Sequence, residues 1–414
     1  MYLLKLLQII VDLIIKLSAI MAKSSQNFRA ENPDEIVFLR LNRLKSTRLC
    51  ENLLREKLSE TPNAAVTDEV IKTKAIGLSS VIESALGYWQ SPSQSLNSKV
   101  LSRYYFMLQL TIAEQVASVV NIDGLREIQR HTENGHGLKT FLLPNGKVPN
   151  ELLIYATQGG HFNSYGKFLG WEMKKCIQDK GIKKQEDITP EVRKKMLSLS
   201  QLFRTIPELR TVIEEYLDEA PLSLHVGHSQ SNMIAQSEFN EIFIKTHHRL
   251  PTLEDSQKLD KTTDIGIYTE SPKIDIPYLE SLGMPLHNFR TYSDTVSKTN
   301  TIIGSISHPG NMTWWKLFPT YSSQYVPTSF VKPIWGERYH SIAVNYILLY
   351  ALSIIVRYMP DVWYRITSGE DNHIGSLIDY YISVMDHVLP LQMLEHIQGT
   401  KLIIHSQGSW MGEI

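Results

Sequence analysis

Apolar residues recur at helical spacing through the first 140 residues of the chain. Four segments show this pattern, and each follows a side chain that can cap the start of a helix: Asn32, Thr67, Ser98 and Asp123. The fourth segment stops at Asn134-Gly135, a sequence typical of a helix end. We therefore expect four helices, over about residues 33–60, 68–89, 99–120 and 124–134.

The rest of the chain divides into a mixed middle and a second helical part. In the middle we expect helices over about residues 151–156, 165–178 and 189–219. Alternating β-branched runs at 263–269, 273–278 and 300–307 predict short strands, which would form a small antiparallel sheet or long β-like loops. After residue 330 we expect helices over about 337–358, 375–388 and 390–398. The first of these has about fifteen consecutive apolar positions, a length that fits a buried helix better than a membrane span.

The first twenty residues are almost wholly apolar and need separate treatment. Their polar residues fall in a wedge roughly 80° wide on a helix, and they are Lys5, Gln8, Asp12 and Lys16. These charges argue against a membrane span, and Asp12 argues against a signal peptide. An amphipathic helix over residues 1–21 that contacts a membrane surface or a partner is one interpretation. The others are a helix packed on the protein itself and a true start at Met21.

These patterns together predict a mainly α fold. An N-terminal helical bundle and a C-terminal helical layer would enclose a mixed middle segment with a few short strands. The expected domains are the N-terminal helix at 1–21, the bundle at 22–140, the mixed α/β region at 141–330 and the C-terminal helical region at 331–414.

Composition and motifs narrow the possible chemistry. The net charge of −1, with 43% hydrophobic and 21% charged residues, indicates an ordinary globular protein. Two cysteines far apart, Cys50 and Cys176, suggest a reduced, cytoplasmic protein without disulfides. The sequence has no phosphate-binding loop, dinucleotide-binding glycine motif or serine-nucleophile elbow. His225, His228, His247 and His248 match no zinc spacing, so we expect no cofactor and no metal.

The segment from Arg126 to His136 offers the most compact set of side chains for catalysis. It reads Arg-Glu-Ile-Gln-Arg-His-Thr-Glu-Asn-Gly-His, with four residues between Arg126 and His131 and five between Arg130 and His136. An imidazole can exchange a proton near neutral pH, and a guanidinium can stabilise charge that builds on a phosphate. Such a pair can cleave RNA without a metal ion.

Arg130, the polar His131 and then His136 resemble the Arg-x(4–6)-His motif of the HEPN superfamily of small helical bundles. The resemblance implies a metal-independent endoribonuclease, toxin-like or active in antiviral defence. Two protomers would pair around one cleft, and the RNA 2′-hydroxyl would be the nucleophile. It also implies that His136 is the general base or acid and that Arg130 stabilises the phosphate, with Arg126 and His131 as an overlapping second match.

Two longer segments resemble the YaaC-like family of bacterial proteins. They are Arg103-Tyr-Tyr-Phe-Met-Leu-Gln-Leu-Thr-Ile-Ala-Glu, followed downstream by His136-Gly-Leu, and Leu349-Tyr-Ala-Leu-Ser-Ile-Ile-Val-Arg-Tyr-Met-Pro-Asp-Val-Trp. The resemblance covers roughly residues 75–140 and 335–400. It implies a mostly helical cytoplasmic bacterial protein and indicates little about the chemistry.

Two functions therefore remain open from the sequence. In the first, the chain is a HEPN-like ribonuclease that acts on RNA as a homodimer. In the second, it is a non-catalytic interaction or regulatory protein with a protein partner. His136 would then bond a carbonyl at the helix end, and the arginines would complement the helix dipole. The two differ in whether Arg130 and His136 converge in a cleft that solvent can reach.

Overall fold

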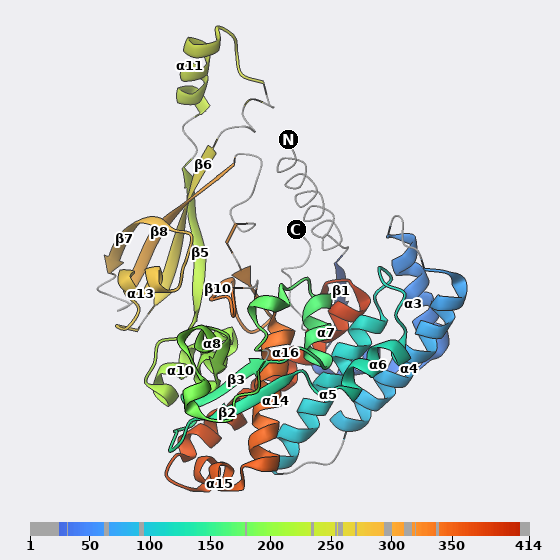
Figure 1. Ribbon diagram of the computed structural model, residues 1–414. Coiled ribbons are helices and arrows are strands. Elements are labelled where there is room, and N and C mark those ends of the chain that lie inside the picture. Colours follow the sequence, from blue (N-terminus) through green and yellow to red (C-terminus); the bar gives the residue numbers. More distant parts are fainter. Residues whose placement is uncertain are drawn as a thin grey trace.

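A computed structural model describes residues 25–405, apart from 31, 62–65, 91–94, 179, 233–235, 253–254, 256–259, 270, 294–299, 310–316, 319 and 337–338. The N-terminal helix expected over residues 1–21 lies outside the described residues. The described part is mainly α, as the sequence predicts, and its helices form one large body beside a separate β-sheet (Figure 1).

The N-terminal part of the body is helical. Its helices are α2 (Pro33–Arg43), α3 (Thr47–Ser59), α4 (Asp68–Trp89), α5 (Leu96–Val116) and α6 (Leu125–Glu133). Asn32 caps α2, as predicted, because its side chain accepts hydrogen bonds from the backbone N–H groups of Asp34 and Glu35. Helix α5 begins one turn earlier than expected, since Ser95 rather than Ser98 caps it.

The single helix expected over 33–60 is two helices, so that prediction was wrong. The break at Leu44–Ser46 frees backbone carbonyls from the helical pattern. The thiol of Cys50 donates to the Leu44 carbonyl at 3.0 Å, and the hydroxyl of Ser79 donates to the Lys45 carbonyl at 2.6 Å. Ser79 lies on α4, so part of what stabilises the break is a contact between helices that local sequence does not reveal.

The C-terminal helices pack against this N-terminal part. They are α14 (Ser341–Tyr358), α15 (Pro360–Ser368) and α16 (Asn372–Gln398). Helix α14 runs beside α5, and both contribute to one hydrophobic core (Figure 1). Helix α14 is long and apolar enough to cross a membrane by length and composition alone, but 72% of it is buried, as in the core helix of a soluble protein. We expected Pro390 to start a new helix, but it lies inside α16.

A three-stranded antiparallel sheet adjoins the helical body. Its strands, in the order β2-β3-β4, are β2 (Leu138–Leu142), β3 (Leu152–Ala156) and β4 (Met196–Ser198). Strand β3 replaces the helix expected over 151–156, because its run of apolar residues is buried throughout and pairs on both sides. The nearby helices are α7 (His161–Phe168), α8 (Pro190–Lys194), α9 (Leu199–Thr205) and α10 (Arg210–Leu217), with 3₁₀ turns at Met173–Lys175, Gln185–Asp187 and Pro207–Leu209.

A six-stranded antiparallel sheet forms the second part of the molecule, and the small sheet predicted for the middle region is thus confirmed. Its order is β7-β8-β6-β5-β10-β9. The strands are β5 (Ser223–Asn232), β6 (Asp260–Thr269), β7 (His287–Ser293), β8 (Asn300–Pro309), β9 (Thr320–Tyr321) and β10 (Ser329–Val331). Helix α13 (Ile276–Ser281) packs on this sheet, where we expected a strand over 273–278, and α11 (Gln236–His247) projects away from it (Figure 1).

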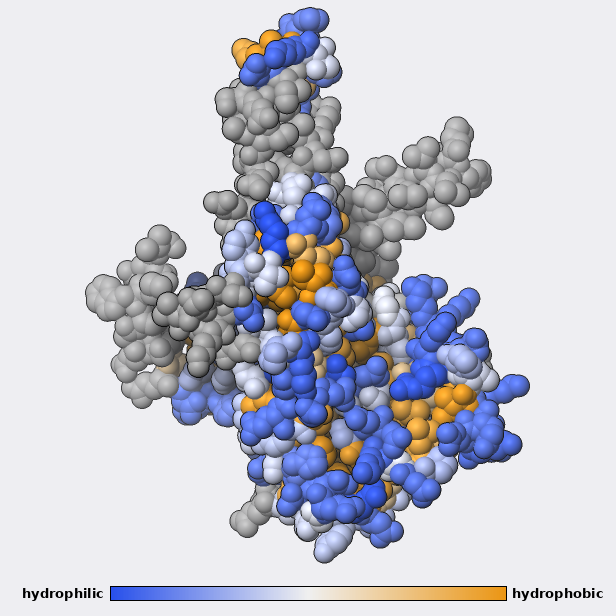
Figure 2. Space-filling view, turned by 90° about the vertical axis from the view of Figure 1, so that its left-hand side faces the viewer, coloured by the Kyte–Doolittle hydropathy of each residue, from blue (hydrophilic) through white to orange (hydrophobic). Residues whose placement is uncertain are grey.

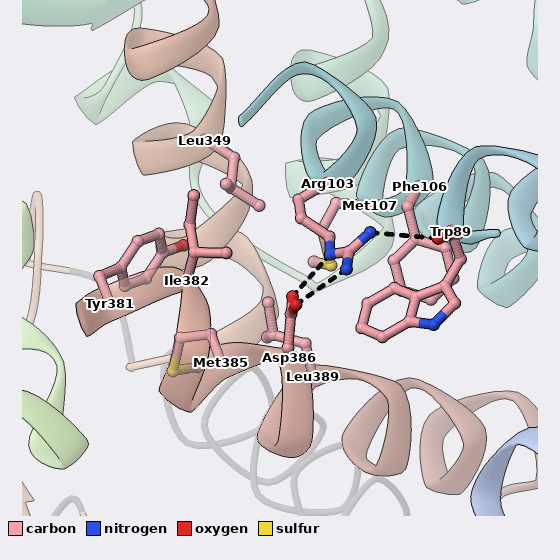
Figure 3. Close-up of a pocket in the computed structure, with 10 residues that line it drawn as sticks. All are labelled: Trp89, Arg103, Phe106, Met107, Leu349, Tyr381, Ile382, Met385, Asp386 and Leu389. Carbon is pink, nitrogen blue, oxygen red and sulfur yellow. Dashed lines mark hydrogen bonds and ion pairs between the residues drawn. The ribbon is translucent and has the colours of Figure 1, made fainter. Parts of the chain in front are cut away.

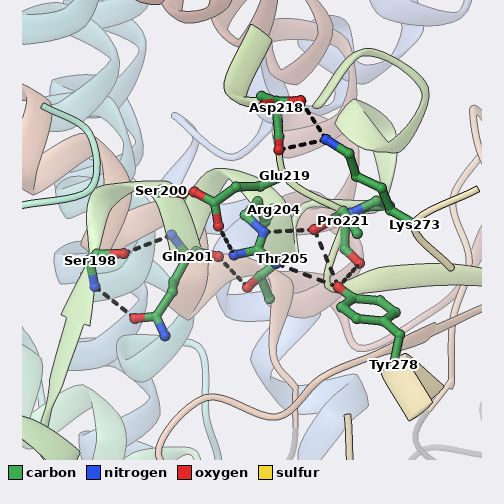
Figure 4. Close-up of polar contacts among 11 residues, drawn as sticks. Ser198, Ser200, Gln201, Arg204, Thr205, Asp218, Glu219, Pro221, Lys273 and Tyr278 are labelled. Carbon is green, nitrogen blue, oxygen red and sulfur yellow. Dashed lines mark hydrogen bonds and ion pairs between the residues drawn. The ribbon is translucent and has the colours of Figure 1, made fainter. Parts of the chain in front are cut away.

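Polar contacts join the sheet to the helical body (Figure 4). Arg204 on α9 forms an ion pair with Glu219, donates to the Ala220 carbonyl at 2.7 Å and reaches the hydroxyl of Tyr278 on α13. Lys273 binds Asp218 at 2.5 Å, just after α10. These contacts hold the short linker between α10 and β5.

The boundaries between the hydrophobic cores differ from the boundaries of the expected domains. One core runs from Val37 to Leu402 and includes most of the buried apolar residues between Val148 and Ile213, while residues 220–330 contribute a separate core under the large sheet. Leu153, Tyr155 and Met196 form a small third cluster. Strands β1 (Gln26–Arg29) and β11 (Leu402–His405) pair in parallel and bring the two ends of the described chain together. In Figure 2, hydrophilic residues cover most of the visible described surface, with small apolar patches between them.

Candidate functional site

The four residues predicted for catalysis lie on α6 and just beyond it. Arg126, Arg130 and His131 are exposed on the helix, whereas His136 is half-buried three residues past its end. Among the described residues, no hydrogen bond or ion pair joins Arg126 or Arg130 to His136. Their catalytic roles therefore stay predictions.

The backbone around His136 is fixed by two glycines and by helix α7. Gly135 and Gly137 have φ angles of +89° and +79°, which favour glycine. A Cβ atom on Gly137 would lie 2.7 Å from the backbone nitrogen of Phe162. That nitrogen donates to the His136 carbonyl at 3.0 Å. The carbonyl of His136 is thus bonded to the backbone of α7.

The His136 side chain contacts tyrosines from two buried helices. Its Nδ1 atom is hydrogen-bonded to the hydroxyl of Tyr104 on α5 at 2.7 Å. The ring centroid lies 5.5 Å from that of Tyr104 and 5.7 Å from that of Tyr350 on α14. Tyr350 is itself held by donating to the Leu138 carbonyl at 2.7 Å. These contacts fix the ring, and Nε2 is the ring nitrogen that Tyr104 does not engage.

Arg357, near the C-terminal end of α14, supplies a positive charge beside this histidine. Its Nε and Nη2 atoms donate to the Ser353 carbonyl and hydroxyl at 3.1 and 3.2 Å, and its Nη1 atom donates to the Tyr105 hydroxyl at 3.4 Å. Burial first and the Arg357 charge second lower the pKa of His136 below its usual value. The imidazole is therefore neutral at pH 7. We call Tyr104, His136, Tyr350 and Arg357 the His136 cluster.

Exposed aromatic rings lie next to this cluster. Tyr358, which is 68% exposed, has its ring centroid 5.1 Å from the Arg357 guanidinium carbon. Tyr88 is partly exposed and stacks on Tyr105 at 5.2 Å. Arginine and tyrosine in this arrangement can contact both the phosphates and the bases of a nucleic acid strand.

Tyr104 and Arg357 were not predicted from the sequence as partners of His136. Both lie within the two segments that resemble YaaC-like proteins, far apart along the chain. The packing of α5 against α14 brings them to His136. The shared resemblance of the two segments was the one sequence feature that could have pointed to them.

A second group of polar side chains lies elsewhere in the same body. Glu114 on α5, His340 at the start of α14 and His396 on α16 form what we call the Glu114 cluster. One ligand atom from each lies within 4.8 Å of the others, so the group can hold a metal ion. Within the described part of the chain, it is the only group of this kind, and it includes none of His225, His228, His247 and His248.

Charge and burial set the protonation of the Glu114 cluster. Burial acts to raise the pKa of Glu114, but His396, His340 and the Tyr165 hydroxyl together lower it to about 2. Burial acts to lower the pKa of His396, but the Glu114 carboxylate raises it above its usual value. Burial and then His396 lower the pKa of His340 to about 4. Glu114 is therefore ionised and His340 neutral at pH 7.

A small internal hollow between α5, α14 and α16 is unsuited to a ligand. It encloses about 10 Å³ and is bordered by Trp89, Arg103 and Asp386 (Figure 3). Arg103 binds Asp386 with two hydrogen bonds of 2.6 and 2.8 Å, and its guanidinium lies 3.7 Å from the centroid of the Trp89 ring. This ion pair connects α5 to α16 and fills the space.

Comparison with known proteins identifies the family. The model of the family described as YaaC-like Protein matches residues 42–397, which include both clusters. Searches of curated proteins and of solved structures found no match to this chain. The family match confirms the YaaC-like resemblance of the two segments, and because it extends over well more than half of the sequence, the chain belongs to the YaaC-like protein family.

Proposed function

We propose that this chain is a metal-independent endoribonuclease whose reaction takes place at the His136 cluster. The observation that carries the proposal is the half-buried, neutral His136, fixed through Nδ1 by Tyr104 and placed beside the Arg357 guanidinium. A general base needs an unprotonated nitrogen near neutral pH and a fixed orientation. His136 meets both conditions.

The reaction follows from the chemistry of these side chains. Nε2 of His136 takes the proton of an RNA 2′-hydroxyl, whose oxygen then attacks the adjacent phosphorus. Arg357 stabilises the negative charge on the phosphate oxygens. The bond from phosphorus to the 5′ oxygen breaks, and that oxygen takes a proton from water. The hydroxide that remains takes the proton from His136 Nε2, which regenerates the base. The products are a 2′,3′-cyclic phosphate and a 5′-hydroxyl, so atoms and charge balance.

Other parts of the proposal rest on the Arg-x(4–6)-His resemblance. Arg126, Arg130 and His131 are exposed on α6 and would contact RNA phosphates there. Burial first, then His136 and His131, lower the pKa of His161, so both histidines lie close enough to α7 to act on it electrostatically. A HEPN-like bundle, a homodimer, a cytoplasmic location and a toxin-like or defensive role belong to the same proposal.

RNA cleavage in the presence of EDTA tests the function. The substrate is a labelled single-stranded RNA of mixed sequence, and the parent is compared with His136→Ala, Arg357→Ala and Arg130→Ala. We expect the first two variants to lose on the order of 10²-fold or more in rate, and Arg130→Ala to lose less. His373→Ala, which alters an exposed histidine on α16, is the matched control and should cleave like the parent.

Intact RNA after incubation with the parent would contradict the proposal. So would equal cleavage by the parent and His136→Ala. Either result would favour a non-catalytic interaction protein. If the cleavage rate falls more in Arg130→Ala than in Arg357→Ala, Arg130 stabilises the phosphate, as the sequence motif predicts.

A further inference from the structure

Three side chains from distant parts of the sequence meet in the Glu114 cluster, away from the proposed RNA site. The Glu114 Oε1 atom lies 2.9 Å from His396 Nδ1, and the rings of His340 and His396 meet edge to face with centroids 5.1 Å apart. Glu114 lies on α5, His396 lies on α16, and His340 is the residue that caps the start of α14. The packing of three helices is therefore needed to form the group.

We propose that Glu114, His340 and His396 bind one divalent transition-metal ion, and that the ion is Zn²⁺. Two imidazoles and one carboxylate are an established zinc ligand set that leaves a fourth position for water or a substrate. The ligand atoms already lie within 4.8 Å of one another, so small rotations of the side chains bring them to coordinating distance. Charge also favours binding, because Glu114 supplies the one anionic ligand.

A hydrogen bond outside the ligand group supports the proposal. The Tyr165 hydroxyl on α7 donates to Glu114 Oε2 at 2.6 Å and thus leaves Oε1 directed at His396. Tyr165 is fully buried, so the carboxylate has a fixed orientation. Metal-binding carboxylates are commonly held in this way by a second hydrogen bond.

His340 can change its hydrogen bonding when an ion binds, and His396 gives the ion a route from solvent. The backbone N–H of Ala343 donates to His340 Nδ1 over a long 3.4 Å. Whichever ring nitrogen of His340 binds the ion, Nδ1 can no longer accept this hydrogen bond. Because the bond is long and therefore weak, its loss costs little free energy. The side chain of His396 is 32% exposed, whereas that of Glu114 is 8% exposed. An ion can therefore reach a buried carboxylate through a partly open histidine.

Zinc titration of the full chain tests the site. Protein stripped with a chelator and then dialysed is titrated with Zn²⁺ by calorimetry, and bound metal is counted by elemental analysis. We expect one tight Zn²⁺ per chain and a higher Tm with zinc. His340→Ala and His396→Ala should each lower the affinity more than tenfold, and Tyr165→Phe should lower it about ten- to hundredfold.

Controls separate this site from incidental zinc binding and from misfolding. His373→Ala lies on the same helix as His396 and should bind zinc like the parent. Circular dichroism of each variant checks the fold, and Co²⁺ replacing Zn²⁺ should give the visible absorption of a nitrogen- and oxygen-ligated ion that His396→Ala abolishes. The proposal is overturned if the parent binds no zinc, if the His340 and His396 variants bind as tightly as the parent, or if Mn²⁺ binds more tightly than Zn²⁺.

Discussion

Two clusters in one helical body place a histidine beside a tyrosine-rich interior, yet they differ in the charge next to the imidazole. In the His136 cluster the neighbour is Arg357, and the pKa of His136 is lowered. In the Glu114 cluster the neighbour is a buried carboxylate, and the pKa of His396 is raised. Burial beside a cation thus favours the neutral form of His136, whereas burial beside a carboxylate favours the protonated form of His396.

Removal of the charged residue beside the histidine should lower the free energy of unfolding more in the Glu114 cluster than in the His136 cluster. Glu114→Ala leaves His396 and the buried Tyr165 hydroxyl without their partner, and we expect the free energy of unfolding to fall by about 3 kcal/mol. Arg357→Ala removes a half-exposed side chain, so its loss should stay near or below about 1 kcal/mol. Urea denaturation of the two variants measures both values, and equal losses would show that the clusters do not differ in this way.

Acid should destabilise the protein because the buried His161 on α7 resists protonation in the folded state. Burial first, then His136 and His131, lower the pKa of His161 to about 3, below its usual value of 6.5. Between these pH values the unfolded state binds more protons, so stability falls as the pH drops. The loss at pH 5 is about 2 kcal/mol. Denaturation of the parent and His161→Gln at pH 7 and 5 measures it, and the variant should lose less on acidification.

Loss of the Tyr104 hydroxyl should reduce the cleavage rate at the His136 cluster but leave the packing of its side chains in place. Tyr104→Phe keeps the ring but removes the hydrogen bond to Nδ1. We expect cleavage to slow by about tenfold, because the imidazole loses its fixed orientation. Zinc affinity should stay unchanged, since Tyr104 is not part of the Glu114 cluster. If zinc affinity falls as much as the cleavage rate, the two clusters are not independent.

The smallest expected effect is a shift in the pH midpoint of cleavage when Arg357 loses its charge. The proposed mechanism uses His136 as a base, and its pKa is lowered, so activity should rise with pH through a midpoint below 6.5. Arg357→Gln removes a cation that disfavours the charged imidazole, so the midpoint should move up by about a few tenths of a pH unit. Single-turnover rates from pH 4.5 to 8 measure the shift, and an unmoved midpoint would separate Arg357 from His136.

How far the sequence predicted the structure also differs between regions. Capped amphipathic helices such as α4 were predictable because their determinants are local. Strand β3 was predicted as a helix, since a short apolar run fits either structure until its partner strands are known. Pro390 was expected to start a helix, but the burial of α16 on both sides of it outweighs the lost backbone hydrogen bond.

The candidate sites follow the same division. His136 could be proposed from the sequence because a compact local motif contains it. The partners Tyr104 and Arg357 could not, because the packing of α5 on α14 determines which side chains meet. Glu114 and His396 lie on α5 and α16, and His340 caps α14, so no local spacing relates the three residues. Local sequence therefore predicts elements and short motifs, whereas sites built across helices depend on the packed core.

The most direct measurement uses two oligonucleotides of the same sequence, one RNA and one with every 2′-hydroxyl methylated, each incubated with the parent protein and EDTA. The proposed chemistry at His136 predicts that only the RNA is cut, that its fragments carry 2′,3′-cyclic phosphate and 5′-hydroxyl ends, and that His136→Ala leaves it intact. Cleavage of the methylated strand, or fragments with 5′-phosphate ends, would contradict the mechanism.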